Sequence, residues 1–191
     1  MATTTRFTGA LDLIVFGVAV ALSAVALAVV EIVGILAPAG PAVTVATDAA
    51  SDLVSSEVVT AVTVRAAEID LAGRLWLISA ELLLAIGALV VVAALIRIAL
   101  AVRREQIFAG GATRALTTIA VTLTIIGFAW PVVDGMGRQH AVESLGIPFE
   151  TLSLPDLLPM APVLFAAITA AVLAGAFAHG ERLRRDTEGL V

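Results

Sequence analysis

The sequence predicts an all-α integral membrane protein: a bundle of four transmembrane helices with a small strand-containing extracellular loop between helices 1 and 2. Of its 191 residues, 60% are hydrophobic and only 14% are charged, whereas soluble domains carry about 25% charged residues. The apolar residues gather in four blocks, each long enough to cross a hydrocarbon core about 30 Å thick. We therefore expect residues 1–191 to form a single membrane domain.

The first apolar block covers about residues 10–36 and is expected to be a transmembrane helix. Ala37-Pro38-Ala39 follows the block and resembles a signal-peptide cleavage site. The block is nevertheless roughly twice as long as the apolar core of a signal peptide, which spans about 7–15 residues. We therefore expect this helix to be retained.

Residues 37–74 are expected to form a water-facing outer loop, because prolines and a glycine interrupt the apolar run and acidic residues follow. Within this loop, residues 43–46 and 61–65 alternate with the period of a β-strand. No tight-turn pair such as Asn-Gly lies between the two stretches. The pattern predicts a small β-hairpin or ribbon outside the membrane.

The second block covers about residues 75–102, with a tryptophan at its start and arginines toward its end, as expected for a helix anchored at two interfaces. A connector at residues 103–114 follows, in which a double glycine should interrupt the helix. The third block ends near Pro131, which can kink or end a helix because proline lacks a backbone donor. The third helix, an outer loop, the fourth helix and a tail are then expected at about residues 115–133, 134–159, 160–179 and 180–191.

The distribution of arginine predicts the orientation. The chain has no lysine, and eight of its eleven arginines lie on the side that holds the connector and both termini. Because positive residues favour the cytoplasmic side, we expect both termini to be cytoplasmic. The outer loops hold nine of the 16 acidic residues, which explains the net charge of -5 without an acidic substrate. Arginine without lysine is typical of a GC-rich bacterial genome, so we expect a multi-pass protein of a bacterial plasma membrane.

The composition also excludes several kinds of chemistry. Without cysteine there are no disulfides, thiolate metal sites or cysteine nucleophiles. His140 and His179 are expected at opposite ends of the bundle, so they cannot share a haem within one chain. No phosphate loop, nucleophile elbow or zincin helix is present. We expect no enzymatic activity, no cofactor, no metal site and no direct contact with nucleic acid.

Four ionisable residues lie within the predicted spans, where such residues are costly and often functional. Asp12 and Arg97 lie near helix ends. Glu31 and Glu81 would lie at a similar outer depth if the first two helices are antiparallel, and they could form a paired carboxylate site for a cation or a proton. The alternative is that each is hydrated near the interface or paired with a residue of the outer loop.

The last helix is expected to pack inside the bundle, because small residues allow the close backbone approach on which helix association in lipid depends. It carries two neighbouring rows of small residues, Ala166, Ala170, Ala174 and Ala178 in one and Ala167, Ala171, Gly175 and His179 in the other.

The cytoplasmic connector and tail form a basic surface that should attract anionic lipid head groups. The alternative interpretation is a docking surface for a soluble partner. The candidate interaction residues are Arg103, Arg104, Phe108, Arg114, Arg184, Arg185, Asp186, Thr187 and Glu188.

The ending Gly180-Glu181-Arg182-Leu183-Arg184-Arg185-Asp186-Thr187-Glu188-Gly189-Leu190-Val191 resembles the C-terminal signature of the bacterial DUF2975 family of small four-helix membrane proteins. Residues 103–108 followed by Arg114 resemble that family's connector, although the family often has Gly-Pro or Gly-Glu-Pro before its phenylalanine. Residues 62–77 resemble its strand-like outer region. The resemblance implies a plasma-membrane protein often encoded beside a small helix-turn-helix regulator, without catalytic residues, whose residues 186–189 fold back against the connector.

Two functions from different classes remain open. The first is a sensory, regulatory or accessory protein that signals through its connector and tail to a cytoplasmic regulatory protein or another membrane subunit. The second is a small transporter or channel subunit that uses Glu31 and Glu81. In both cases the surrounding partner is the lipid bilayer, and assembly into a homo-oligomer is compatible with the sequence.

Overall fold

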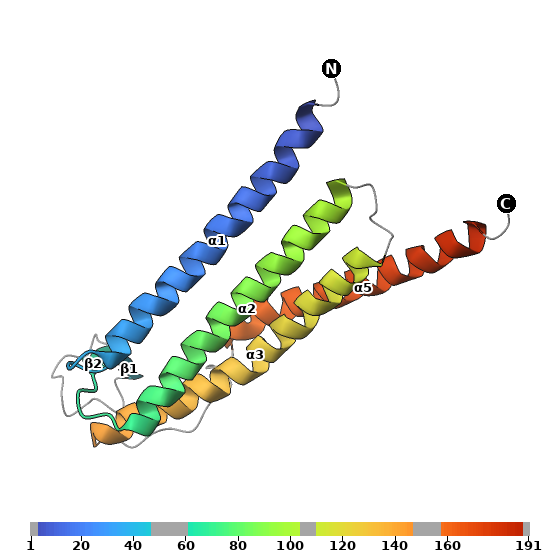
Figure 1. The fold of residues 1–191 in the computed structure, drawn as a ribbon. Helices are drawn as coiled ribbons and strands as arrows, with labels where there is room; N and C mark the ends of the chain where they lie inside the picture. Colours follow the sequence, from blue (N-terminus) through green and yellow to red (C-terminus); the bar gives the residue numbers. More distant parts are fainter. Residues whose placement is uncertain (1–3, 47–60, 104–109, 147–157, 189–191) are drawn as a thin grey trace. The chain divides into compact units, whose positions relative to one another are not determined.

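The computed structural model describes residues 4–46, 61–103, 110–146 and 158–188. Within these ranges the chain forms four long α-helices, and a two-stranded hairpin follows the first of them (Figure 1). The elements are α1 (Thr4–Leu36), β1 (Ala42–Ala46), β2 (Ala61–Arg65), α2 (Leu71–Arg103), α3 (Gly111–Ser144) and α5 (Ala161–Glu188), the last preceded by a 3₁₀ turn at Leu158–Met160.

Each of these four helices contains a stretch long and apolar enough to cross a membrane. Among the described residues the stretches are Ile14–Leu36, Leu71–Arg103, Gly111–Ser144 and Leu158–Leu183. The predicted fold class, an all-α membrane protein with four apolar helices and a small hairpin between the first two, is therefore confirmed.

The chain divides into two compact units, which are described separately below. The first, called the Arg-rich unit, comprises Met1–Val25, Ala85–Phe128 and Met160–Val191. The second, called the hairpin unit, comprises Ala26–Leu84 and Ala129–Pro159. Eight of the eleven arginines belong to the Arg-rich unit. They are the same eight that are expected on the cytoplasmic side.

An apolar cluster joins the strands of the hairpin unit to its helices. β1 and β2 pair antiparallel, and the hydroxyl oxygens of Thr44 and Thr63 lie 3.4 Å apart across the pair. Because strand side chains alternate between faces, Val43 points away from this pair and is buried. It packs in a cluster that α1, α2 and α3 also supply, formed by Ile35, Val43, Ala66, Ile69, Leu77, Ala141 and Val142.

Polar contacts secure the start of α2 in the same unit. Asp70 caps the helix, because its Oδ1 accepts a hydrogen bond of 2.8 Å from the backbone N–H of Gly73. Arg74 donates to the carbonyl oxygen of Ile35 at 3.2 Å, in the last turn of α1, where carbonyls lack partners within their own helix. The ends of α1 and α2 are thus linked directly.

Glycines allow α2 and α3 to approach closely in the hairpin unit. A Cβ atom placed on Gly73 would lie 2.5 Å from the Cβ of His140. A Cβ on Gly137 would lie 2.6 Å from the Cγ of Leu77 and 3.0 Å from its backbone nitrogen. Larger residues would force the two helices apart, as expected where small residues form a helix crossing.

The outer loop predicted at residues 134–159 must be corrected, because α3 continues to Ser144 with Pro131 inside it. An ion pair and a hydrogen bond four residues apart support the extension. Arg138 contacts Asp134 at 2.6 Å, and Gln139 donates to Glu143 at 2.8 Å. The prediction followed the fall in hydropathy after Pro131, but a helix continues through less apolar residues because its hydrogen bonds join backbone groups.

Gly146 marks the end of α3. Its φ of 71° is a left-handed conformation that glycine adopts without strain, and its N–H donates to the carbonyl of Glu143 at 3.0 Å. The other predicted helix bounds differ as well. α1 and α2 begin earlier than expected, at Thr4 and Leu71, and α5 includes residues 180–188 of the predicted tail.

In the Arg-rich unit, small apolar side chains form the contact between helices. The buried cluster comprises Ala94 of α2, Ala115, Ile119 and Ala120 of α3, and Ala170 of α5. A Cβ atom on Gly127 would lie 3.0 Å from the Cγ of Leu164, so α3 and α5 also approach closely at a glycine.

The packing face of α5 matches the predicted rows only in part. Ala170 and Ala174 are each 7% exposed, as expected for the first row, but Ala166 is exposed. In the second row Ala167 is buried, whereas Ala171, Gly175 and His179 are exposed. The buried residues are spaced by three and then four, because the 3.6-residue turn makes a contact face alternate between these spacings.

Candidate functional site

Glu81 of α2 lies within electrostatic range of one acid on α1 and one on α3 in the hairpin unit. Glu81 is half-buried, Glu31 of α1 is exposed, and the charges of Glu31 and of Asp134 on α3 both reach Glu81. Whether Glu31 and Glu81 act as a paired site stays a prediction. We call Glu31, Glu81 and Asp134 the carboxylate cluster.

Asp134 is not among the acids predicted for this site, because the sequence predicts a loop at residues 134–159. Its side chain is only 14% exposed. Its Oδ2 forms an ion pair with Nε of Arg138 at a distance of 2.6 Å. The sequence feature that could have indicated a helix here is the spacing of four residues between Asp134 and Arg138, since such pairs face each other on a helix. Arg138 thus offsets part of the negative charge of the cluster.

Near the cluster, α3 also has a buried hydrogen-bond donor without an acceptor. Within the described residues, the indole Nε1 of Trp130 is buried and has no hydrogen-bond acceptor. Trp130 lies one turn before Asp134. A buried donor without an acceptor typically costs about 1–3 kcal/mol.

The chemistry that the carboxylate cluster offers is attraction of cations and uptake of protons. Among the described residues, no group of three or more His, Cys, Asp or Glu side chains is arranged to hold a metal ion. His140, the histidine of this unit, contacts Asp70 instead, with its Nδ1 at 3.3 Å from the carboxylate oxygen. This contact ties α3 to the cap of α2.

A second candidate site joins the end of the connector to the tail. Gly110 has a φ of 75°, and a Cβ placed on it would lie 3.2 Å from Oε1 of Glu181 on α5. Glu181 also forms an ion pair with Arg185, four residues later. Neither Gly110 nor Glu181 was among the predicted interaction residues, although the double glycine and the acid one turn before Arg185 were visible signals.

The predicted interaction surface is described only in part. Arg103, Arg114, Arg185 and Asp186 are exposed. α5 continues through Glu188, so residues 186–188 are helical, and Glu181 of this helix lies near Gly110. Gly189 and residues 104–109 of the connector lie outside the described residues. The remaining predicted residues lie outside the described residues, either entirely or in their side chains, and they are Arg104, Phe108, Arg184, Thr187 and Glu188.

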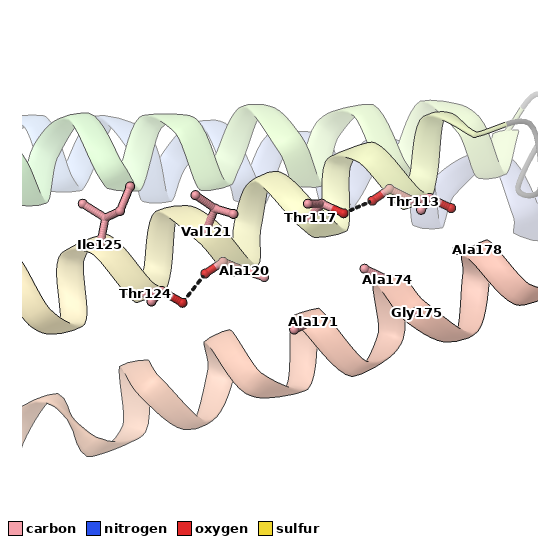
Figure 2. A pocket seen from close by; sticks show the side chains of 10 residues that line it. All are labelled: Thr113, Thr117, Ala120, Val121, Thr124, Ile125, Ala171, Ala174, Gly175 and Ala178. Carbon is pink, nitrogen blue, oxygen red and sulfur yellow. Dashed lines mark hydrogen bonds between the residues drawn. The ribbon is translucent and has the colours of Figure 1, made fainter.

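A groove of about 550 Å³ lies between α3 and α5 in the Arg-rich unit (Figure 2). Two of its threonine hydroxyls are turned to their own helix, since Thr117 donates to the carbonyl of Thr113 at 2.9 Å and Thr124 to that of Ala120 at 2.8 Å. We call this the α3/α5 groove. It is lined by Thr113, Thr117, Ala120, Val121, Thr124 and Ile125 of α3 and by Ala171, Ala174, Gly175 and Ala178 of α5.

No family model, curated protein or solved structure matches this chain. The resemblance to the DUF2975 family therefore has no support from a family match. The class of protein follows from the helices, because four of the described segments are long and apolar enough to span a bilayer. The chain is a polytopic membrane protein whose helices contact lipid.

Proposed function

We propose that this chain is a non-enzymatic regulatory protein of a bacterial plasma membrane, with both termini in the cytoplasm. In this proposal the hairpin unit responds to a condition outside the cell, and the connector and tail convey the response to a cytoplasmic regulatory protein. The observation that carries the proposal is the closeness of the Glu181 carboxylate to Gly110, where an added Cβ would lie 3.2 Å from Oε1. This contact makes the start of α3 and the end of α5 a joint surface.

The charges around this contact support a protein partner. Arg114 follows Gly110 by one turn, and Arg185 and Asp186 follow Glu181 by about one turn. These exposed side chains present both signs of charge, which suits recognition of a protein surface with complementary charges. The resemblance of the tail to a family often encoded beside a small regulator adds to this choice of partner.

Gly110→Ala tests the proposal. Alanine at a positive φ costs about 1–2 kcal/mol, and its Cβ would crowd the Glu181 carboxylate. The matched control is Gly111→Ala, because a Cβ on Gly111 meets no atom within 4 Å. With a photo-crosslinking residue in place of Asp186 in native membranes, we expect a soluble protein to be crosslinked in the parent chain and the control, and to be lost with Gly110→Ala.

Two outcomes would reject the regulatory proposal. The first is that the parent chain crosslinks to lipid and membrane proteins only. The second is that Gly110→Ala and Gly111→Ala retain the same soluble partner in equal amounts, since the contact would then have no bearing on recognition.

The second candidate function is a small transporter or channel subunit, and the carboxylate cluster is the observation that favours it. Three acids on three helices, two of them within the predicted spans, could accept a cation or a proton. Glu81→Gln removes one charge at nearly constant size, whereas Glu68→Gln removes an exposed charge elsewhere in the unit. If the cluster conducts, proton or cation flux in liposomes should fall with Glu81→Gln alone. Equal flux in both variants would exclude this role.

A further inference from the structure

The α3/α5 groove is apolar in spite of its threonines. The hydroxyl protons of Thr117 and Thr124 are donated to carbonyl oxygens one turn earlier in α3, so the groove wall presents mainly methyl and methylene groups. The opposite wall is formed by alanines and by Gly175, whose Cβ position meets no atom within 4 Å. An occupant of this groove is therefore an apolar chain.

The length of the groove matches one leaflet of a bilayer. Along α3 it runs from Thr113 to Ile125, which at 1.5 Å per residue is about 18 Å. Half of a hydrocarbon core about 30 Å thick is about 15 Å. A contact with a spanning helix would continue across both leaflets, whereas a lipid acyl chain ends at the midplane. The extent of the groove thus favours an acyl chain.

Cations flank the end of the groove where α3 begins. Arg114 follows the lining residue Thr113, and Arg182 lies about one turn after the lining residue Ala178. Among the described residues, Arg114 and Arg182 are exposed and form no ion pair with an acidic side chain. Of the acids nearby, Glu181 is paired with Arg185, and Asp186 is exposed one turn beyond Arg182, farther from the groove. This end of the groove is therefore suited to a negatively charged head group.

We propose that the α3/α5 groove binds one acyl chain of an anionic phospholipid, whose phosphate lies between Arg114 and Arg182. The apolar walls, the length of one leaflet and the flanking cations together select this ligand. The proposal goes beyond the regulatory function and does not depend on it. It would give the Arg-rich unit a bound lipid between the two helices that form the joint surface of Gly110 and Glu181.

The test uses the purified full chain in detergent with phosphatidylglycerol that carries a photoreactive diazirine in one acyl chain. Phosphatidylcholine with the same chain is the comparison probe. We expect phosphatidylglycerol to label peptides that contain residues 113–125 and 171–178, and to do so more strongly than phosphatidylcholine. Each arginine near an anionic surface is typically worth about fivefold in affinity, so Arg114→Gln with Arg182→Gln should abolish the preference between the two lipids.

Gly175→Leu fills the groove and should reduce labelling of these peptides severalfold. Leucine raises helix propensity and finds open space at this position, so the variant is expected to fold. Gly34→Leu is the matched control, because its Cβ also meets no atom within 4 Å and Gly34 belongs to the other unit. This control should label as the parent chain does.

Three results would overturn the proposal. Labelling of residues 113–125 and 171–178 could be unchanged in Gly175→Leu, which would place the lipid elsewhere. Equal labelling by the two lipids in the parent chain would remove the role of the arginines. A crosslink between two copies of the chain at Ala171, formed in place of lipid adducts, would identify the occupant as a second copy.

Discussion

The hairpin unit and the Arg-rich unit are held together by different means. The hairpin unit combines an apolar cluster with a helix cap, an ion pair and an arginine that donates to the end of α1. Within the described residues of the Arg-rich unit, the buried cluster between helices consists of alanines and an isoleucine, and a leucine packs against a glycine. The comparison teaches that the hairpin unit adds polar contacts to its apolar packing, whereas the buried cluster of the Arg-rich unit depends on the close approach of small residues.

The largest effect is expected from filling the tightest helix crossing of the hairpin unit. Gly137→Val would place side-chain atoms against the backbone nitrogen of Leu77, which cannot move without shifting α2. We expect a loss of about 3 kcal/mol, the upper part of the range for overpacking. Gly127→Val in the Arg-rich unit meets the side chain of Leu164, which can change rotamer, so about 1 kcal/mol is expected there.

Denaturant titration or thermal melting in detergent measures both variants, with Gly34→Val as the control in open space. The order of the losses should be Gly137→Val, then Gly127→Val, then Gly34→Val. A larger loss for Gly127→Val than for Gly137→Val would contradict the view that the hairpin unit contains the more rigid crossing.

An intermediate effect is expected at the cap of α2. Asp70→Ala removes both the hydrogen bond to the N–H of Gly73 and the contact with His140, so we expect a loss of about 1 kcal/mol. Asp70→Asn keeps a capping oxygen and removes the charge. Melting at neutral pH should therefore give Asp70→Asn a stability between the parent chain and Asp70→Ala. If the two variants lose equal stability, the cap contributes nothing and the contact with His140 accounts for the effect.

The smallest effect is expected from the threonines of the α3/α5 groove. The hydroxyls of Thr117 and Thr124 donate to carbonyl oxygens of α3 itself, so Thr124→Val with Thr117→Val should change the free energy of unfolding by about 0.5 kcal/mol or less. A substantial loss of stability on melting would show that these hydroxyls hold α3 to a neighbouring helix. In that case the Arg-rich unit would also depend on polar contacts.

Part of the carboxylate cluster could be predicted from the sequence. Glu31 and Glu81 were selected because antiparallel helices bring residues at equal depth to the same level, a relation that follows from helix rise alone. Asp134 could not be selected in this way, because its place depends on α3 continuing past Pro131. The same continuation brings Ala141 and Val142 into the hairpin cluster.

The sequence by itself determined the four apolar helices, the hairpin and the unequal distribution of arginine, because hydropathy, strand alternation and charge are properties of short segments that add along the chain. Only the tertiary structure decided which face of α5 is buried, where α3 ends, and that Glu181 meets Gly110. It also decided that α3 and α5 leave a groove between them. These features depend on how helices cross, and a crossing is set by pairs of residues far apart in the sequence.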